Sequence, residues 1–280
     1  MFNEFNHNIE IFLRLKYPVG ILKRLFFKFV STLRVTPRDY IVLKFFGIKM
    51  IGNPAKSVIA DTIYKYHSHE LIVTEFIKRI IKKDMTVVDV GAYHGYFSLI
   101  AAKLVGSNGR VFAFEPYPNS ICTMKYNIKL NNFSNINLSD YALYSETIDL
   151  PLRYRHEASC FDFYCKDIPE NLSTAHCDAY DNLTEQLSIG KVDFIKMDIE
   201  GAELKALQGM EKTLRTYKPK LVIEIHPNKF GQYNYTMKDL VDFLHNLSYK
   251  IKPLNIFQSS LNEIINGKDS KHVLFHIYCY

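Results

Sequence analysis

The amino-acid sequence predicts an α/β protein with a doubly wound, mostly parallel sheet. From residue 70 onward, short apolar segments alternate with segments of helical period, which is the pattern of parallel strands joined by crossover helices. At residues 87–98, one apolar segment runs directly into a glycine-containing turn and a helix. The 280 residues, 48% hydrophobic and 23% charged, can bury a full-sized core. Disordered, collagen-like and disulfide-stabilised small proteins are therefore excluded.

The expected elements follow one another in two series. After a helical stripe at 72–81, the first series has strands at 86–90, 111–114 and 136–138 and helices at 96–104 and 119–130. Residues 145–178 contain few helix signals and are expected to form an insertion with a strand near 148–154. The second series has strands at 192–197 and 221–225 and helices at 202–214 and 236–247, the last with a capping-box start at Thr236 and Asp239. Segments 248–254 and 272–279 predict two closing strands, an antiparallel pair joined by a loop over 262–271.

The net positive charge of the chain comes from its first 50 residues, whose balance of +6 equals the whole formal excess. Residues 21–34 predict a basic amphipathic helix, and two interpretations stay open. The helix can contact an anionic membrane surface as part of residues 10–34, or it can pack its apolar face on its own domain, which is the commoner case. No basic stripe follows, so nucleic acid is not an expected partner. The expected division is an N-terminal extension over 1–60 and a main domain over 61–280.

The cysteines and the hydropathy pattern favour a cytoplasmic protein. Five cysteines without a C-x-x-C pair fit a reducing compartment better than a disulfide framework. The N-terminus lacks the pattern of a signal peptide, and the longest charge-free run, 90–102, is too short to span a bilayer. The His and Cys residues between 156 and 177 lack the paired spacing of a zinc site, so no metal is expected.

The sharpest motif covers residues 87–98, where a buried strand ends close to Asp89 and a turn contains Gly91 and Gly95. Glycines let the backbone approach a ligand at the carboxyl edge of a doubly wound sheet. A dinucleotide fold requires G-x-G-x-x-G to hold a pyrophosphate, and the third glycine is missing here. The turn instead suits a ligand with a cationic amino group and no phosphate, such as S-adenosylmethionine. A merely tight strand-to-helix turn is the alternative.

The next strand ends in a second acidic residue, Glu115, which is followed by Pro116. A carboxylate at this strand tip is positioned to accept hydrogen bonds from both ribose hydroxyls of an adenosine. Taken by itself, Glu115 could be a plain surface carboxylate. The two motifs together strengthen the prediction of an adenosine-containing cofactor.

Five motifs in this order resemble the FkbM-type S-adenosylmethionine-dependent methyltransferases. They are 88–92 with 95–98, 114–116 with Asn127 and Asn131, 142–143, 194–203, and 222–227. The resemblance covers about residues 66–228 and implies a Rossmann-like class I methyltransferase fold, with a mostly parallel seven-stranded sheet and an antiparallel last strand. It also implies O-methylation as the usual reaction. Tyr93 departs from the family, which commonly has Asn at that position.

The residues expected to bind the cofactor lie in or beside these motifs: Asp89, Gly91, Ala92, Gly95, Glu115, Pro116, Asp140, Ala142 and Asp198.

Catalysis is expected at the ends of the strands that precede Asp198 and His226. Methyl transfer from a sulfonium is an in-line displacement, so orientation of the acceptor matters most, and a hydroxyl acceptor also benefits from a general base. The candidates for that base are Asp198, His226 and Glu200, although His226 can equally be a turn residue before Pro227. Glu203 follows a helix start, where negative charge is favourable without catalysis.

Several functions remain in competition. The chain lacks an Asn-Pro-Pro-Tyr or Asp-Pro-Pro-Tyr segment and a Pro-Cys nucleophile, which makes amine and nucleobase acceptors less favoured than a sugar or glycan hydroxyl. One alternative is a methyltransferase for another small molecule. A second is a membrane-peripheral protein that binds S-adenosylmethionine without catalysis. A nicotinamide-dependent enzyme is disfavoured by the missing glycine.

Overall fold

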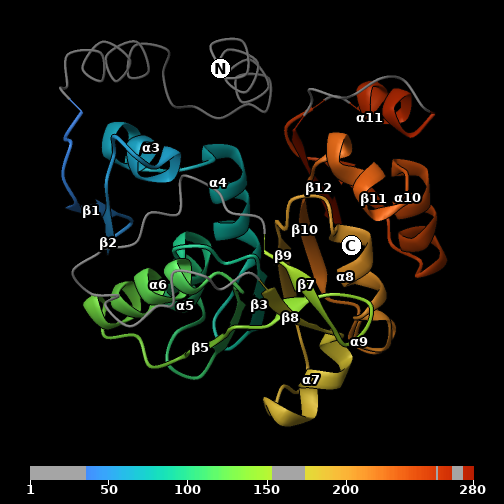
Figure 1. Ribbon diagram of the computed structural model, residues 1–280, viewed down its shortest axis with the longest axis horizontal. Helices are drawn as coiled ribbons and strands as arrows, with labels where there is room; N and C mark the ends of the chain where they lie inside the picture. The colour runs from blue at the N-terminus through green and yellow to red at the C-terminus, as the bar shows by residue number, and fades with distance from the viewer. Residues whose placement is uncertain (1–35, 153–173, 257, 267–273) are drawn as a thin grey trace.

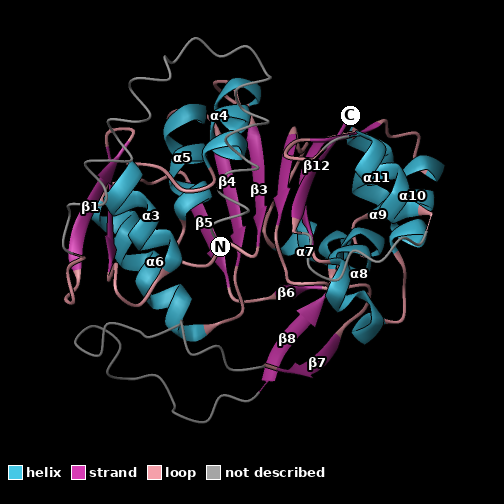
Figure 2. Cartoon of the chain, turned by 90° about the horizontal axis from the view of Figure 1, so that it is seen from above, coloured by secondary structure: helices cyan, strands magenta, loops and turns pink. Residues whose placement is uncertain are grey.

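A computed structural model describes residues 36–152, 174–256, 258–266 and 274–280. Its main feature is a seven-stranded sheet in the order β11-β12-β10-β9-β3-β4-β5, with helices on both sides (Figures 1 and 2). β12 runs antiparallel to β10 and β11, whereas the paired strands from β10 to β5 are parallel. The doubly wound fold class is therefore confirmed, including the antiparallel last strand.

The strands of the main sheet are short and lie close to the predicted ranges. They are β3 (Thr86–Val90), β4 (Arg110–Phe114), β5 (Ile136–Ser139), β9 (Phe194–Met197), β10 (Lys220–Ile225), β11 (Ile251–Pro253) and β12 (Phe275–Cys279). The helices around them are α3 (Val58–Tyr66), α4 (Leu71–Ile80), α5 (Tyr96–Val105), α6 (Pro118–Leu130), α7 (Tyr180–Gln186), α8 (Glu203–Gln208), α9 (Glu211–Tyr217), α10 (Met237–Asn246) and α11 (Gln258–Ile265). The 3₁₀ helix η1 (Pro227–Tyr233) follows β10. The predicted capping box of α10 is present.

Alternation along the central strands divides the core between two faces of the sheet. One set of inward-facing residues, including Val90, Met197 and Ile223, packs with buried residues of α8, α9 and α10. Residues of the opposite parity, including Val87 and Val222, pack with residues of α4 and α5. Since side chains alternate with period two, every second residue near the carboxyl ends of β9 and β10 points to the α4 side. These positions carry the polar residues described below.

A two-stranded hairpin, β1 (Ile41–Phe45) and β2 (Ile48–Gly52), packs on the main domain through the apolar residues Leu43, Phe45, Ile48 and Met50. Two asparagines of α6 fasten it. The side-chain oxygen of Asn127 accepts from the backbone N–H of Ile51 at 2.8 Å, and the side chain of Asn131 exchanges two hydrogen bonds with the backbone of Lys49. The described part of the N-terminal region therefore shares the core of the main domain.

The insertion forms a small sheet of its own. β6 (Ala142–Leu143), β8 (Thr174–Asp178) and β7 (Ile148–Pro151) lie in the order β6-β8-β7. The strand predicted near 148–154 is therefore present as β7. Residues 153–173, which include His156, Cys160 and Cys165, lie outside the described residues.

Two predicted elements differ in the structure. The helix expected over 202–214 is two helices, because the Gly209 carbonyl and the Thr213 N–H, which would pair in a continuous helix, both bond to Asp181 instead. Gly209 also lies so close to the backbone carbonyl of Tyr144 that a Cβ there would be 1.9 Å from it. Residues 262–265, expected to begin a loop, belong instead to α11, whose buried residues include Leu261 and Ile264.

Three sequence-based expectations concern the N-terminus and the cysteines. The amphipathic helix at 21–34 and the membrane contact through 10–34 lie outside the described residues and stay predictions. Among the helices of the described residues, none has the length and apolar character needed to cross a bilayer. Cys177 and Cys279 are buried free thiols.

Candidate active site

The site forms where the carboxyl ends of β3, β4 and β9 meet. The backbone N–H groups of Gly91 and Ala92 both donate to the carbonyl of Phe114, and the N–H of Asp198 donates to the carbonyl of Val90. These bonds hold the three loops that follow the strands against one another. The first motif and the Asp198 segment, more than 100 residues apart in sequence, therefore share one edge of the sheet.

The turn between β3 and α5 has an unusual backbone path. Gly91, Tyr93 and Gly95 all have positive φ angles, of 78°, 50° and 89°. Glycine adopts this conformation without steric cost, whereas Tyr93 does not. The ring of Tyr93 stacks on His94 with centroids 3.7 Å apart. Burial lowers the pKa of His94 to about 3, so this ring is neutral.

Glu115 folds back onto the same turn. Its two carboxylate oxygens accept one backbone N–H each, from Tyr93 at 2.7 Å and from Tyr117 at 2.9 Å. Burial raises the pKa of Glu115 to about 7, and the two hydrogen bonds oppose that rise. Each carboxylate oxygen has a further lone pair, so Glu115 can bind the backbone and a ligand together.

Asp89 is buried on the neighbouring strand. Ser98 donates to one of its oxygens at 2.5 Å, while the other oxygen, Oδ1, is buried without a hydrogen bond. Burial raises the pKa of Asp89. A buried acceptor without a donor is costly in a folded protein, so Oδ1 is suited to a ligand that brings its own N–H group.

Lys196 neutralises the acidic residues around it. It lies opposite Asp89 in the β3–β9 register, and its Nζ is 3.3 Å from Asp198 Oδ2. The side chain of Lys196 is almost fully buried, with its Nζ 4.8 Å from the centre of the Phe97 ring. Burial alone would lower the pKa of Lys196, but the charges of Asp198 and Asp89 raise it above its usual range. The ammonium group is therefore a permanent positive charge at the site.

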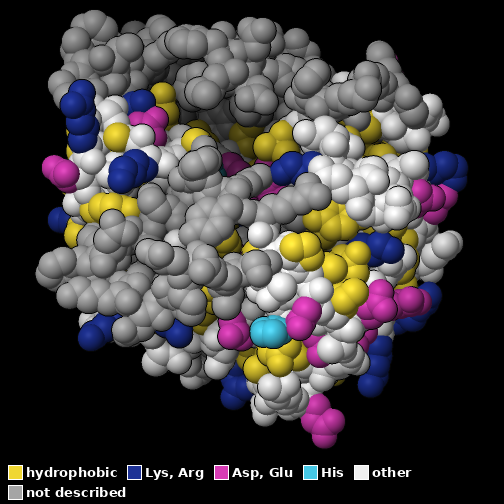
Figure 3. Space-filling view, viewed as in Figure 1, with side chains coloured by type: hydrophobic (Ala, Val, Ile, Leu, Met, Phe, Trp, Pro, Cys, Tyr) yellow, Lys and Arg dark blue, Asp and Glu magenta, His cyan; other side chains and the backbone are white. Residues whose placement is uncertain are grey.

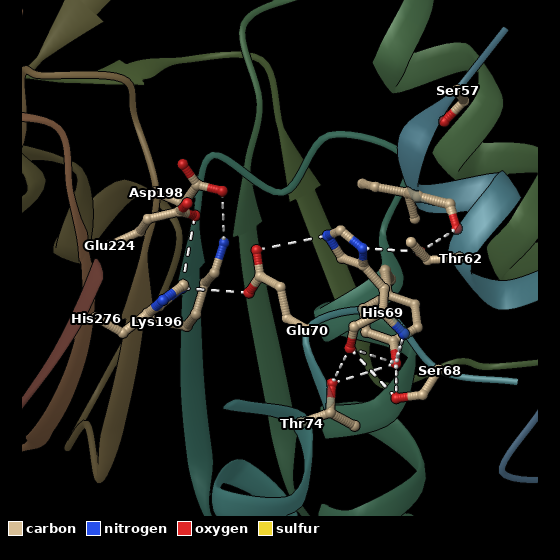
Figure 4. A network of polar contacts seen from close by, with 12 residues as sticks. Ser57, Thr62, Ser68, His69, Glu70, Thr74, Lys196, Asp198, Glu224 and His276 are labelled. Carbon is tan, nitrogen blue, oxygen red and sulfur yellow. Dashed lines mark hydrogen bonds and ion pairs between the residues drawn. The ribbon is translucent and has the colours of Figure 1, made fainter. Parts of the chain in front are cut away.

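A second group of polar side chains continues this site toward α4 (Figure 4). Glu70 lies between His69 and His276, with His276 Nε2 3.2 Å from one of its oxygens and His69 Nε2 3.5 Å from the other. His276 Nε2 is also 3.5 Å from Glu224 on the adjacent strand. Glu70 reaches this position from a left-handed backbone conformation with φ of 42°.

The carboxyl groups of this cluster do not share one protonation state. Burial would raise the pKa of Glu70, yet the charge of His276 holds it well below its usual range. Burial would likewise raise the pKa of Asp198, but Lys196 lowers it. For Glu224, burial and the negative charge of Asp198 act together and raise the pKa well above the usual value. These surroundings therefore favour the ionised form of Asp198 and the neutral form of Glu224 beside it.

His226 stands at the start of η1 with both ring nitrogens facing acidic groups. Its Nδ1 is 2.9 Å from Oε1 of the fully buried Glu203. Its Nε2 is 3.5 Å from Glu200 and 3.8 Å from Asp198. The three predicted catalytic residues therefore lie together, and Glu200 also pairs with Lys229.

The remaining predicted residues lie farther along the same edge or outside the main sheet. Pro116 follows Glu115, and Asp140 is an exposed residue immediately after β5. Ala142 lies on β6 of the small sheet, paired with Cys177.

Sequence reasoning missed three residues of the cluster, Glu70, Lys196 and His276, and left Glu224 without an assigned role. Lys196 and Glu224 stand two residues before Asp198 and His226, and that spacing of two on a strand was the available signal. Glu70 and His276 carry no local signal.

Two sets of side chains in the described part of the chain have ligand atoms within 4.8 Å of one another, as a cation site requires. They are Glu70, Glu224 and His276, and Asp198, Glu224 and His226. Lys196 already supplies a positive charge to Asp198. Figure 3 shows acidic side chains inside a hollow near the middle of the face drawn there.

Comparisons with known proteins agree with this geometry. The sequence matches the methyltransferase FkbM domain family over residues 89–251, more than half of the chain. The protein-L-isoaspartate(D-aspartate) O-methyltransferase family matches residues 28–140.

Individual relatives are distant. The chain is 26% identical over 210 residues to the hexuronic acid methyltransferase AglP of Haloferax volcanii. This alignment covers 68% of this chain and 80% of that protein. It is 24% identical over 199 residues to Methyltransferase 1 of Beauveria bassiana, covering 64% and 78%. A crystal structure of the FkbM methyltransferase from Methylobacillus flagellatus KT has a TM-score of 0.46 at 20% identity, covering 82% of this chain and 63% of that chain. Because the family match covers more than half of the chain, the chain belongs to the FkbM methyltransferase family and is an enzyme whose cofactor is S-adenosylmethionine.

Proposed function

We propose that the enzyme transfers the methyl group of S-adenosylmethionine to a hydroxyl group of a sugar. The observation that carries the proposal is the imidazole of His226, whose Nε2 faces the carboxyl edge beside Asp198. A hydroxyl is a poor nucleophile until a base removes its proton, so a positioned imidazole fits this acceptor. The hexuronic acid methyltransferase relative supports a sugar as the molecule that bears the hydroxyl.

The cofactor-binding roles are assigned to the buried acids of the first two motifs. Asp89 Oδ1, buried without a hydrogen bond, fits an ammonium group, and the free lone pairs of Glu115 fit the ribose hydroxyls. Gly91, Ala92 and Gly95 supply a backbone surface without bulky side chains. When bound there, the cofactor supplies an electrophilic methyl group.

His226 is the better of the predicted bases. Lys196 keeps the pKa of Asp198 low, and a carboxylate with a low pKa accepts a proton weakly. An imidazole, in contrast, has a ring nitrogen that can accept a proton, and Nε2 of His226 faces this edge. We therefore assign proton removal to His226, and we assign to Asp198 and Glu200 the orientation of the hydroxyl and the stabilisation of the imidazolium that forms.

The charge of the site disfavours a carboxylate as the acceptor. Asp198 and Glu200 face the same ring nitrogen, and the cationic side chains next to them, Lys196 and Lys229, already pair with them. A second carboxylate brought to this edge would be repelled and desolvated. A carboxylate acceptor would also have no use for a base, because it is ionised at neutral pH.

The test is methyl transfer by the purified full chain with methyl-labelled S-adenosylmethionine. Neutral hexose glycosides, hexuronic acid glycosides and lipid-linked saccharides are compared as acceptors. The expected product is a methyl ether, which survives mild alkali, whereas a methyl ester is hydrolysed. Label that is lost in alkali, or transfer only to amines, would contradict the proposal.

A further inference from the structure

The contact between His226 and Glu203 joins the proposed base to a residue that sequence reasoning treated as an ordinary helix start. Glu203 is the first residue of α8 and is completely buried, 0% exposed. Its Oε1 lies 2.9 Å from His226 Nδ1, on the side of the ring opposite the proposed acceptor. A charge that merely complements a helix N-terminus does so at the surface, without the desolvation that full burial costs.

We infer that Glu203 is a positioning residue, which holds His226 in the tautomer that carries its proton on Nδ1 and leaves Nε2 free to accept one. This inference rests on the proposed function, because it assigns a purpose to the imidazole that removes the hydroxyl proton.

The hydrogen bonds around Glu203 determine which group donates. Oε1 also accepts from the backbone N–H of Gly201 at 2.9 Å, and Oε2 is 3.0 Å from the hydroxyl of Tyr235. Burial and the charge of Glu203 raise the pKa of Tyr235, so this phenol stays protonated. Both oxygens of Glu203 thus face hydrogen-bond donors, and a carboxylate in such surroundings acts as an acceptor, so we assign the proton between Glu203 and the ring to Nδ1.

The orientation of the ring follows from the same contacts. With Nδ1–H directed at Glu203, the second ring nitrogen faces Asp198 and Glu200. Glu203 therefore holds both Gly201, next to Glu200, and Tyr235, two residues after η1, and the hydroxyl of Tyr235 is also 2.7 Å from the Gly201 carbonyl. Glu203 thus aligns both the imidazole and the backbone beside it.

The proton and charge balance of the transfer is simple. The acceptor oxygen forms a bond to the methyl carbon while the bond from that carbon to sulfur breaks, and the sulfonium becomes a neutral thioether. The hydroxyl proton moves to His226 Nε2, and the positive charge of the imidazolium is stabilised by Glu203 until the proton passes to water. Glu203 keeps its charge throughout, as the carboxylate of a Ser-His-Asp triad does.

The first test is spectroscopic and needs no acceptor. In the full chain labelled with ¹⁵N-histidine, the ring signals of His226 are identified by their loss in His226→Asn. The inference expects a protonated Nδ1 and an unprotonated Nε2 in the neutral ring. A proton on Nε2 instead would overturn it, whatever the enzyme methylates.

The second test is kinetic and uses Glu203→Gln. A glutamine can donate its amide N–H to Nδ1, which favours the wrong tautomer, so kcat is expected to fall roughly a hundredfold or more. The KM for the acceptor and the Kd for S-adenosylmethionine are expected to stay within about threefold, because Glu203 touches neither.

The matched control is Asp181→Asn, which removes another carboxylate that accepts backbone N–H groups and a hydroxyl, in this case from Lys212 and Thr213. It is expected to lower the thermal midpoint without lowering kcat. If Glu203→Gln keeps wild-type kcat while His226→Asn loses it, Glu203 is structural and the inference is wrong. If His226→Asn keeps its activity, the proposed base is wrong, a result distinct from the tautomer measurement.

Discussion

Gly91 lies directly against the backbone carbonyl of Asp198, so closely that a Cβ on Gly91 would be 1.9 Å from the Asp198 oxygen. The turn after β3, which we propose binds the cofactor, therefore contacts the Asp198 segment at a position where only a residue without a side chain fits. The glycine lets the ends of β3 and β9 approach, in addition to any contact it makes with the cofactor.

Replacing this glycine tests that relationship. Gly91→Ala combines an alanine at a φ of 78° with an overlap against backbone that cannot simply rotate away. The free energy of unfolding is expected to fall by about 2 kcal/mol or more, and the affinity for S-adenosylmethionine to fall with it. Thermal melts and calorimetry measure the two effects.

A control glycine is available on the surface. Gly190 is exposed, and a Cβ there meets nothing within 4 Å, so Gly190→Ala is expected to leave stability and affinity almost unchanged. Equal behaviour of the two variants would show that the close approach at Gly91 is not required.

Cofactor affinity is expected to depend on pH through Glu115, whose pKa burial raises to about 7. Only the ionised carboxylate accepts from both ribose hydroxyls, so binding weakens as the pH falls below 7. At pH 6 about a tenth of the Glu115 carboxyl groups are ionised, so the apparent Kd is expected to be roughly tenfold higher than at pH 8.5, where nearly all are ionised. Titration calorimetry from pH 5.5 to 8.5 measures this dependence.

Glu115→Gln is expected to bind S-adenosylmethionine more weakly and to lose the pH dependence near 7. Glu211→Gln, on the exposed face of α9 where Glu211 pairs with Arg215, serves as the control and is expected to retain both. A wild-type affinity that is constant between pH 6 and 8 would contradict the assigned role. The same raised pKa makes the cofactor-free protein lose stability as the pH rises from about 4.5 through 7, because the folded state favours the protonated form.

Asn127 links the hairpin to the turn between β3 and α5. Its side-chain oxygen accepts from the backbone N–H of Ile51, and its side-chain NH₂ donates to the backbone carbonyl of His94. Asn127→Ala leaves both buried backbone groups unpaired and is expected to cost about 2 to 4 kcal/mol of stability. The Kd for the cofactor should also rise several-fold, because the turn loses its tether.

Asn131→Ala is the matched comparison for this prediction. Asn131 fastens the same hairpin from the same helix, and its side-chain hydrogen bonds go to the backbone of Lys49 and of Asn127. It is expected to lower stability by a smaller amount and to leave cofactor affinity unchanged. A cofactor effect of equal size in both variants would indicate that the hairpin, and not the tether to His94, supports the site.

Two substitutions separate proton transfer from orientation. His226→Asn is expected to lower kcat roughly a hundredfold or more with the cofactor Kd unchanged, as loss of a general base does. Asp198→Asn keeps the imidazole and is expected to reduce kcat less while raising the acceptor KM. Single-turnover kinetics with labelled cofactor would measure both, and a larger kcat loss in Asp198→Asn would assign the base to Asp198.

The sequence by itself determined the fold class and most of the strands and helices of the main domain, and it predicted where the cofactor binds. Apolar periods of two and 3.6, the glycine turn after β3 and the acidic residues at the ends of β3 and β4 are local features, and local backbone preferences are visible within a few residues. The family motifs carry the same local information, which is why Asp89, Glu115 and Asp198 were identified from it.

Tertiary structure alone decided the rest of the site. Glu70 comes from a left-handed residue before α4, His276 from the antiparallel last strand, and Glu203 acquires its partner only when β10 brings His226 beside α8. The break between α8 and α9 likewise depends on Asp181, which is distant in sequence and bonds to the Gly209 carbonyl and the Thr213 N–H. Strand register and burial bring these groups together, and they also set which carboxyl groups are ionised, because a pKa depends on the charges and desolvation that the packed chain creates around each group.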